Sequence, residues 1–171
     1  MASGILILRL VLGGTMAGHG AQKLFGAFGG NGLKGTAGFF AMIRFRAPAL
    51  MALLAALCEF GGGAAFAAGF LTPFAALALA VVMLIAIVTV HVKNGFWAGD
   101  SGFEFNLLIW AAAIAVAGSS PGRFSVDHAL EWDGSLSGWR WTVGVAVASV
   151  LLATLILVFG RKPAEAEPAA S

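Results

Sequence analysis

Charged side chains stand inside two of the long apolar runs of this sequence, Arg9 in the first and Glu59 in the second. A charge at membrane depth is costly, and it usually marks a functional group or a specific ion pair. Counting 1.5 Å per helical residue from the inner ends of the two runs places both side chains at a depth of about 20 Å. We therefore predict an Arg9–Glu59 ion pair inside a helix bundle. The pair could serve only to hold the helices together, or Glu59 could be a carboxylate beside a bound ligand.

Further polar residues are candidates for proton transfer. On a helix, Arg9, His19 and Lys23 fall within an arc of about 80°, so the first apolar run carries a polar stripe that should face inward. His91, near the end of the third run, and Glu104, at the start of the fourth, should lie on the same side of the membrane as His19. These three groups could relay protons to a quinone. The two histidines could instead be solvated at the interface, and haem ligation by them is the least favoured interpretation.

The remaining motifs argue against most soluble activities. The single cysteine, Cys58, excludes an internal disulfide and leaves no cysteine pair, so we predict no metal site. Residues 30–35 match G-x-G-x-x-G, but an apolar helix precedes them in place of the strand that a dinucleotide site requires. The net charge is +2 and no basic stripe is interleaved with aromatic residues, which argues against nucleic-acid binding.

Helices in a membrane must position these residues. Of 171 residues, 60% are hydrophobic and 11% are charged, whereas soluble domains carry about 25% charged residues. A soluble domain of this length could not bury so much apolar surface. We predict an all-α integral membrane protein, with a four-helix transmembrane bundle plus a fifth C-terminal transmembrane helix. The expected spans are 4–25, 47–70, 73–92, 103–118 and 141–160, of which the fourth is short for a bilayer.

The connections predict an interfacial helix and an orientation. Only residues 71–73 join the second and third spans, which should form a tight hairpin. In segment 26–46, aromatic residues followed by Arg44 and Arg46 suit a short helix at the membrane surface. Seven Lys and Arg residues on one side against two on the other predict a cytoplasmic C-terminus and an outer N-terminus in the plasma membrane. Gly14 and Gly18 form a small-residue face that should pack against a helix and permits a homo-oligomer.

Several stretches, taken in order, resemble the DoxX family of membrane proteins. They are His19-Gly20-Ala21-Gln22-Lys23-Leu24-Phe25-Gly26 after Arg9, and the segments 35–40, 59–63, 69–73, 103–108 and 122–127. The resemblance covers about residues 4–128 and implies a four-helix membrane domain at 1–128. A polar extracytoplasmic loop at 129–140, an additional transmembrane helix at 141–160 and a disordered cytoplasmic tail at 161–171 would follow. The additional helix departs from the family's four-helix core.

The resemblance implies a redox-linked role. The family is named for a small membrane subunit of an archaeal thiosulfate:quinone oxidoreductase, and actinobacterial relatives are linked to a membrane complex with a superoxide dismutase and a sulfurtransferase in thiol and oxidative stress. The family motifs contain the candidate ligand-binding residues and the candidate catalytic residues of this chain. The ligand-binding candidates are Arg9, Gln22, Lys23 and Glu59, and the catalytic candidates are His19, His91 and Glu104.

Three functions follow from these observations. The leading hypothesis is a membrane subunit of a thiosulfate- or thiol:quinone-type oxidoreductase, working with a soluble oxidoreductase or sulfurtransferase-type partner. No cofactor is assigned, and quinone is the candidate. A non-catalytic membrane anchor or assembly factor is the first alternative, and a transporter of small molecules or lipids is the second.

Overall fold

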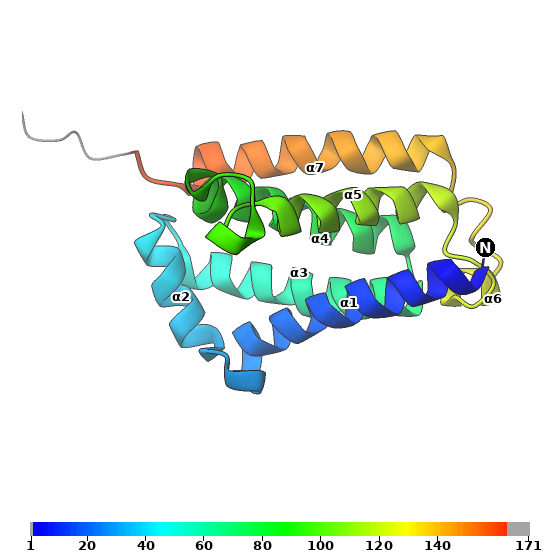
Figure 1. Ribbon diagram of the computed structural model, residues 1–171, viewed down its shortest axis with the longest axis horizontal. Helices are drawn as coiled ribbons and strands as arrows, with labels where there is room; N and C mark the ends of the chain where they lie inside the picture. Colours follow the sequence, from blue (N-terminus) through cyan, green and yellow to red (C-terminus); the bar gives the residue numbers. More distant parts are fainter. Residues whose placement is uncertain (1, 164–171) are drawn as a thin grey trace, which may run out of the picture.

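Five long helices run the length of the molecule in alternating directions in the computed structural model, which describes residues 2–163 (Figure 1). They are α1 (Ala2–Phe25), α3 (Pro48–Ala68), α4 (Thr72–Ala86), α5 (Glu104–Ser119) and α7 (Trp139–Gly160). The end of α4 continues through a π-helical turn at Ile87–His91 and a 3-10 turn at Val92–Asn94. The bundle confirms the predicted fold class. Most of the tail predicted as disordered, residues 164–171, lies outside the described residues.

Within residues 2–163, four helical stretches are long and apolar enough to cross a membrane. They are α1, α3, α7 and the continuous stretch Thr72–Asn94, and the shortest of them has 21 residues. The apolar helix α5 has only 16 residues, fewer than the roughly 20 that span a bilayer. The four long stretches make this a multi-pass membrane protein surrounded by lipid, and α5 is a short apolar helix at the position of the predicted fourth span.

The tight turn between α3 and α4 depends on the residues that end and begin these helices. Gly69 ends α3 with a left-handed φ of 65°, a conformation that glycine adopts without strain. A Cβ at Gly69 would also collide with the guanidinium of Arg9. Pro73 stands in the first turn of α4, where the missing backbone N–H costs nothing. These residues explain why the predicted hairpin forms with so short a connection.

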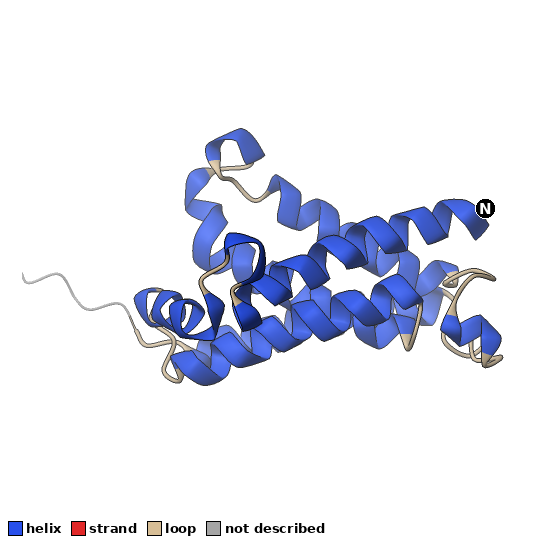
Figure 2. Ribbon diagram, turned by 90° about the horizontal axis from the view of Figure 1, so that it is seen from below, coloured by secondary structure: helices blue, strands red, loops and turns tan. Residues whose placement is uncertain are grey.

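Two short helices lie at opposite ends of the bundle. In Figure 1, α2 (Gly32–Met42) crosses one end steeply and does not continue along the bundle axis, and Figure 2 shows the helical bundle from a second side. This is the short helix predicted between the first two spans. The single-turn helix α6 (Val126–Ala129) lies at the other end, near the N-terminus (Figure 1). We call these two extremities the α2 end and the α6 end.

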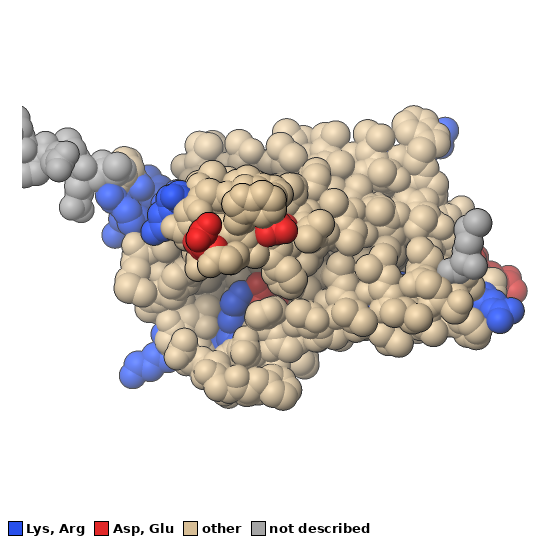
Figure 3. All heavy atoms as spheres, viewed as in Figure 1, with Lys and Arg blue, Asp and Glu red and all other residues tan. Residues whose placement is uncertain are grey.

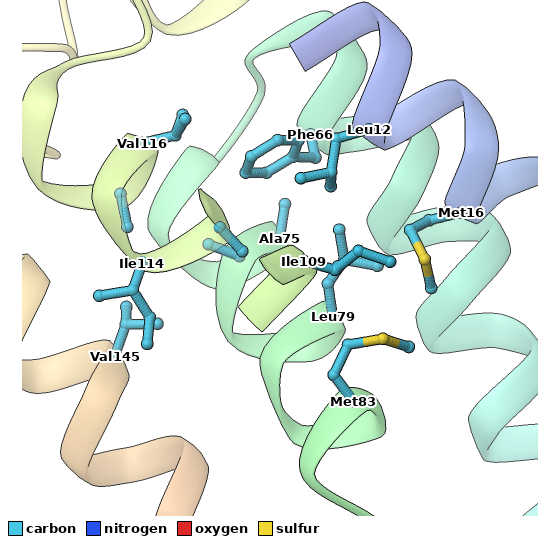
Figure 4. Packing of buried hydrophobic residues seen from close by; sticks show 13 residues of the cluster. Leu12, Met16, Phe66, Ala75, Leu79, Met83, Ile109, Ile114, Val116 and Val145 are labelled. Carbon is cyan, nitrogen blue, oxygen red and sulfur yellow. The ribbon is translucent and has the colours of Figure 1, made fainter. Parts of the chain in front are cut away.

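The core of the bundle is apolar and lies among α1, α3, α4, α5 and one side of α7 (Figure 4). Its larger buried side chains are Leu12, Met16, Phe66, Leu79, Met83, Ile109, Ile114, Val116 and Val145. At the contact between α5 and α7, the Trp110 indole donates a hydrogen bond of 3.2 Å to the buried hydroxyl of Ser149. Because buried polar groups need such partners, this bond fixes α7 against the bundle.

Glycines allow α1 and α3 to approach each other closely. Gly13 and Gly20 of α1 and Gly63 of α3 lie against the backbone of the partner helix, with no room for a Cβ. Small residues permit this kind of contact between membrane helices. The prediction that Gly14 and Gly18 form the packing face is wrong for contacts within the chain. A Cβ on either residue would meet no other atom within 4 Å.

The C-terminal end of α7 is tied to the segment between α2 and α3. Phe45 and Arg161 form an isolated antiparallel β-bridge. On either side of it, the Arg46 N–H donates to the Gly160 carbonyl at 2.8 Å, and the Lys162 N–H donates to the Arg44 carbonyl at 2.9 Å. The last helix is therefore joined to the α2 end by backbone pairing as well as by side-chain packing.

Candidate functional site

The Lys23 ammonium and the Glu59 carboxylate form an ion pair between α1 and α3. Glu59 is buried, with 2% of its surface exposed, whereas the Lys23 side chain is 31% exposed. The predicted Arg9–Glu59 pair is therefore wrong, because the cation that reaches Glu59 comes from the other end of α1.

The register between α1 and α3 explains this correction. Gly20 lies against Phe60, whereas Arg9 lies against Gly69. Arg9 and Glu59 are consequently separated by about three helical turns along the bundle, or about 16 Å. The depth estimate assumed that the two helices begin at the same level. In the structure, the start of α3 extends beyond the end of α1, beside α2.

Arg9 binds the loop at the α6 end. Its guanidinium donates hydrogen bonds to the backbone carbonyl of Pro121 and, at 2.7 Å, to that of Phe124. Only 1% of Arg9 is exposed. These charge-assisted bonds satisfy the two terminal nitrogens of the guanidinium, whereas its buried Nε has no hydrogen-bond partner among residues 2–163. The contacts indicate that Arg9 holds the loop before α6 against the bundle, and they give no support to a ligand-binding role.

A buried carboxylate caps the start of α4, which sequence reasoning missed. Asp127 accepts hydrogen bonds from the backbone N–H groups of Leu71 at 2.7 Å and Thr72 at 2.9 Å, and from the Thr72 hydroxyl at 2.6 Å. A carboxylate at a helix N-terminus satisfies its unpaired N–H groups and interacts favourably with the helix dipole. The available signal was Leu71, which cannot cap the helix that follows it.

An apolar cavity of about 190 Å³ lies beside the Lys23–Glu59 pair, toward the α2 end. Figure 3 shows the surface hollowed in this part of the molecule, with basic and acidic atoms together inside the hollow. The lining side chains are apolar except for four, those of Lys23, Cys58, Glu59 and Thr89. The apolar lining residues are Phe39, Phe40, Ile43, Phe45, Met51, Leu54, Ala55, Val81, Val82, Ile85, Ala86, Val90 and Ile156.

Three elements shape this cavity. The helix α2 contributes Phe39 and Phe40, and α3 contributes the wall that contains Glu59. The opposite wall is the end of α4, including Thr89 and Val90 of the π-helical turn. Short π-helical segments within α-helices are frequent at functional sites. The cavity is therefore formed where α4 departs from regular α-helical geometry.

Gln22 and His19 lie on α1 close to this site but do not line the cavity. The His19 Nδ1 is 3.2 Å from the Gln22 carbonyl oxygen, and the Gln22 amide donates to the Phe28 carbonyl at 3.3 Å. Gln22 thus holds the turn after α1. Of the predicted polar stripe on α1, Arg9 is buried, Lys23 is half-buried and His19 is exposed.

His91 and Glu104 contact the segment that connects α4 with α5. The His91 Nδ1 is 2.8 Å from the Ser101 carbonyl, and a Glu104 carboxylate oxygen accepts a hydrogen bond of 2.9 Å from the Ala98 N–H. Both side chains therefore order this connection, and neither lines the cavity. Within residues 2–163, no three His, Cys, Asp or Glu side chains are grouped so that they could hold a metal ion.

Comparison with known proteins identifies the family of this chain. The DoxX family model matches residues 4–92, which is more than half of the chain. The chain belongs to the DoxX family. It is also 32% identical over 116 residues to a Bacillus subtilis (strain 168) protein named "Putative oxidoreductase CatD", covering 68% of this chain and 80% of that protein. No solved structure matches this DoxX protein.

The segment that matches the DoxX family contains nearly all of the cavity. Of the lining residues, only Ile156 lies outside residues 4–92. The Lys23–Glu59 pair is likewise inside this segment, whereas the partners of Arg9 and the capping residue Asp127 are outside it. The cavity, and not the clamp at the α6 end, is therefore the candidate site within the part of the chain that defines the family.

Proposed function

We propose that this DoxX protein is the membrane subunit of a quinone-linked oxidoreductase, and that its cavity binds the quinone ring. The observation that carries the proposal is the Lys23–Glu59 pair, with Glu59 buried, at the wall of an otherwise apolar cavity. A quinone ring has apolar faces and polar atoms only at its ring oxygens, which matches such a wall. The name of the Bacillus relative, "Putative oxidoreductase CatD", supports the same class of activity.

The size of the cavity suits a ring and not a whole lipid-soluble quinone. A volume of about 190 Å³ is below the range of about 300–1,000 Å³ that encloses most drug-sized ligands. The long apolar tail of a membrane quinone would remain outside, along the lipid-facing sides of the helices. The ring would then lie between the aromatic side chains of α2 and the Glu59 wall of α3.

Proton exchange with the aqueous phase would take place at the α2 end. Lys23 is partly exposed, and His19 stands one helical turn before it on the same face of α1. We propose His19 as the group that exchanges protons with solvent, with His91 and Glu104 as further candidates at this end. Replacing His19 and His91 together with Ala should abolish quinone-linked turnover of the reconstituted complex. Full retained turnover would refute the relay.

A soluble partner would supply electrons at the same end of the molecule. Basic side chains gather there (Figure 3), from the segment before α3, the end of α7 and the connections beside them. They are Lys34, Arg44, Arg46, Lys93, Arg161 and Lys162. We propose that this end faces the cytoplasm of a plasma-membrane protein, with the N-terminus outside, and that a soluble oxidoreductase or sulfurtransferase-type protein with an acidic face binds it.

The experiment that tests this proposal compares two alanines of α3. Ala55 lines the cavity, whereas Ala64 is exposed on the lipid-facing surface. The wild-type protein, Ala55→Leu and Ala64→Leu would be purified from native membranes in mild detergent, and bound quinone would be extracted and quantified. We expect quinone in the wild type and in Ala64→Leu, and a large loss in Ala55→Leu. A wild-type protein without quinone, or equal quinone in both variants, would contradict the proposal.

The same preparations test the partner. Mass spectrometry of co-purifying proteins should find a soluble oxidoreductase or sulfurtransferase-type protein in near-stoichiometric amount. Charge reversal at Arg44 and Arg46, which lie at the α2 end outside the cavity, should release it while quinone stays bound. A preparation that retains a partner but binds no quinone would favour the anchor or assembly-factor alternative.

A further inference from the structure

Only one of the two carboxylate oxygens of Glu59 has a partner. Oε1 receives the hydrogen bond from the Lys23 ammonium. Oε2 is inaccessible to solvent and has no hydrogen-bond partner within residues 2–163. A buried acceptor without a donor costs free energy, and the cost is larger when the acceptor is charged. The site is therefore incomplete in one specific respect, since it lacks a hydrogen-bond donor.

The protein atoms around the cavity do not offer a strong donor to this oxygen. The hydroxyl of Thr89 already donates to the Ile85 carbonyl at 2.7 Å. The thiol of Cys58 is at most a weak donor. All other lining side chains except Lys23 and Glu59 are apolar and carry no hydrogen-bond donor. Because Glu59 lines the cavity, a rotation of its carboxylate would turn the buried Oε2 toward the cavity, where the molecule that occupies it can supply the missing donor.

We propose that the cavity selects the hydroquinone form of its ligand, whose phenolic O–H donates to the free Glu59 oxygen. This inference rests on the proposed function, because it assumes that a quinone couple is the ligand. A hydroquinone carries an O–H group at each ring oxygen, whereas a quinone carries only carbonyl acceptors. Against Glu59, a quinone would place one acceptor opposite another and leave the carboxylate unsatisfied.

The Lys23 ammonium does not remove this preference. It donates to Oε1 of Glu59 and can also donate to a ring oxygen of either form, since carbonyl and hydroxyl oxygens both accept. The difference between the two forms therefore arises at Glu59 alone. A hydrogen bond to a buried charged group is among the stronger ones in proteins. Its gain should make hydroquinone bind about tenfold or more tightly than quinone.

The test measures the binding of 2-decylhydroquinone and 2-decyl-1,4-benzoquinone, which share one tail. The full-length protein would be placed in lipid nanodiscs without oxygen, and empty nanodiscs would correct for partition into lipid. We expect the wild type to prefer the hydroquinone by about tenfold or more. If both forms bind equally, or the quinone binds more tightly, the inference fails while the proposed function stands. If neither form binds, the proposed function fails and the inference with it.

Two isosteric substitutions assign the preference to Glu59. Glu59→Gln keeps the shape of the side chain and removes its charge, so the preference should fall to less than about threefold. Glu131→Gln makes the same change on an exposed side chain at the α6 end and should leave the ratio unchanged. A preference that survives in Glu59→Gln would refute the assignment. The wild-type ratio does not depend on either variant, so it decides the inference even if Glu59→Gln fails to fold.

Discussion

Adding one methyl group at Gly63 should separate α1 from α3, whereas the same change at Gly61 should not. A Cβ at Gly63 would lie 2.5 Å from the backbone nitrogen of Ala17 and 2.7 Å from the carbonyl oxygen of Gly13. Unstrained contacts between heavy atoms lie at about 3.5–4.0 Å. The two helices would therefore have to move apart locally by about 1 Å.

The expected magnitude follows from this overlap. Overpacking a tight contact lowers the unfolding free energy by about 1–3 kcal/mol. The variants Gly63→Ala and Gly61→Ala share the same gain in helix propensity, about 1 kcal/mol for a change from glycine to alanine. A Cβ at Gly61 would meet no atom within 4 Å, so Gly61→Ala carries the gain without the overlap. Gly63→Ala should therefore be less stable than Gly61→Ala by about 1–3 kcal/mol.

The assay is reversible unfolding of the purified protein from mild detergent into increasing fractions of SDS, followed by helix content. Because a shift of α1 also moves Lys23 relative to Glu59, Gly63→Ala should bind less quinone as well. If Gly63→Ala unfolds at the same SDS fraction as Gly61→Ala, the close approach of α1 to α3 is wrong. The register that brings Lys23 to Glu59 would then be wrong with it.

Three further predictions concern the α6 end. Arg9→Lys keeps the charge but loses the planar fork that reaches two loop carbonyls, and it should lower the unfolding free energy by about 1.5–3 kcal/mol in the same SDS assay; unchanged stability would remove Arg9 as the clamp of this loop. Thr72→Val removes one of the three hydrogen bonds to Asp127 and should destabilise the protein by about 1–2 kcal/mol. If Thr72→Val destabilises a variant without the Asp127 carboxylate by the same amount, the hydrogen bond is not the cause. The hydrogen bond from His128 lowers the pKa of Asp133 below its ordinary value. The stabilisation by this bond is therefore present above about pH 4 and is lost as the pH falls through the lowered pKa. The stability of the wild type should drop more than that of Asp133→Asn between about pH 6 and pH 3, and parallel stability curves would contradict the role of this pair.

The membrane fold could be predicted from sequence because each long apolar run has one stable solution in lipid. Only a helix satisfies all of its own backbone hydrogen bonds there, so the runs around Glu59 and His91 had to be helices. The short connection at residues 71–73 then required neighbouring helices to be antiparallel. These arguments need no information about how side chains of distant segments meet.

The pairing of charges could not be predicted in the same way. Both Arg9 and Lys23 lie on α1, and the choice between them as the partner of Glu59 depends on the relative height of α1 and α3. That height is fixed by close contacts at Gly13, Gly20 and Gly63, which depth counting from the helix ends ignores.

The cap of α4 was beyond the sequence arguments for a related reason. Asp127 follows Thr72 by 55 residues, and only the folding of the loop after α5 onto the α3–α4 turn brings them together. Polarity alone would assign this carboxylate to water. In the sequence, an Asp that is buried and hydrogen-bonded looks the same as an Asp that is exposed to water, so telling the two apart requires the tertiary structure.

The contacts that α7 makes through Ile156 and through the β-bridge at Phe45 have a consequence for the biosynthesis of this protein. Membrane segments emerge from the ribosome in order, with the N-terminal ones first, so α1, α3, α4 and α5 are made before α7. Only when α7 is present can Ile156 join the cavity wall and residues 160–162 pair with residues 44–46. Until then, the growing chain holds Glu59 beside an unfinished wall that faces lipid. A chain that stops after α5 would therefore carry the whole family segment and still lack part of the cavity wall, so termination late in the gene should weaken ligand binding.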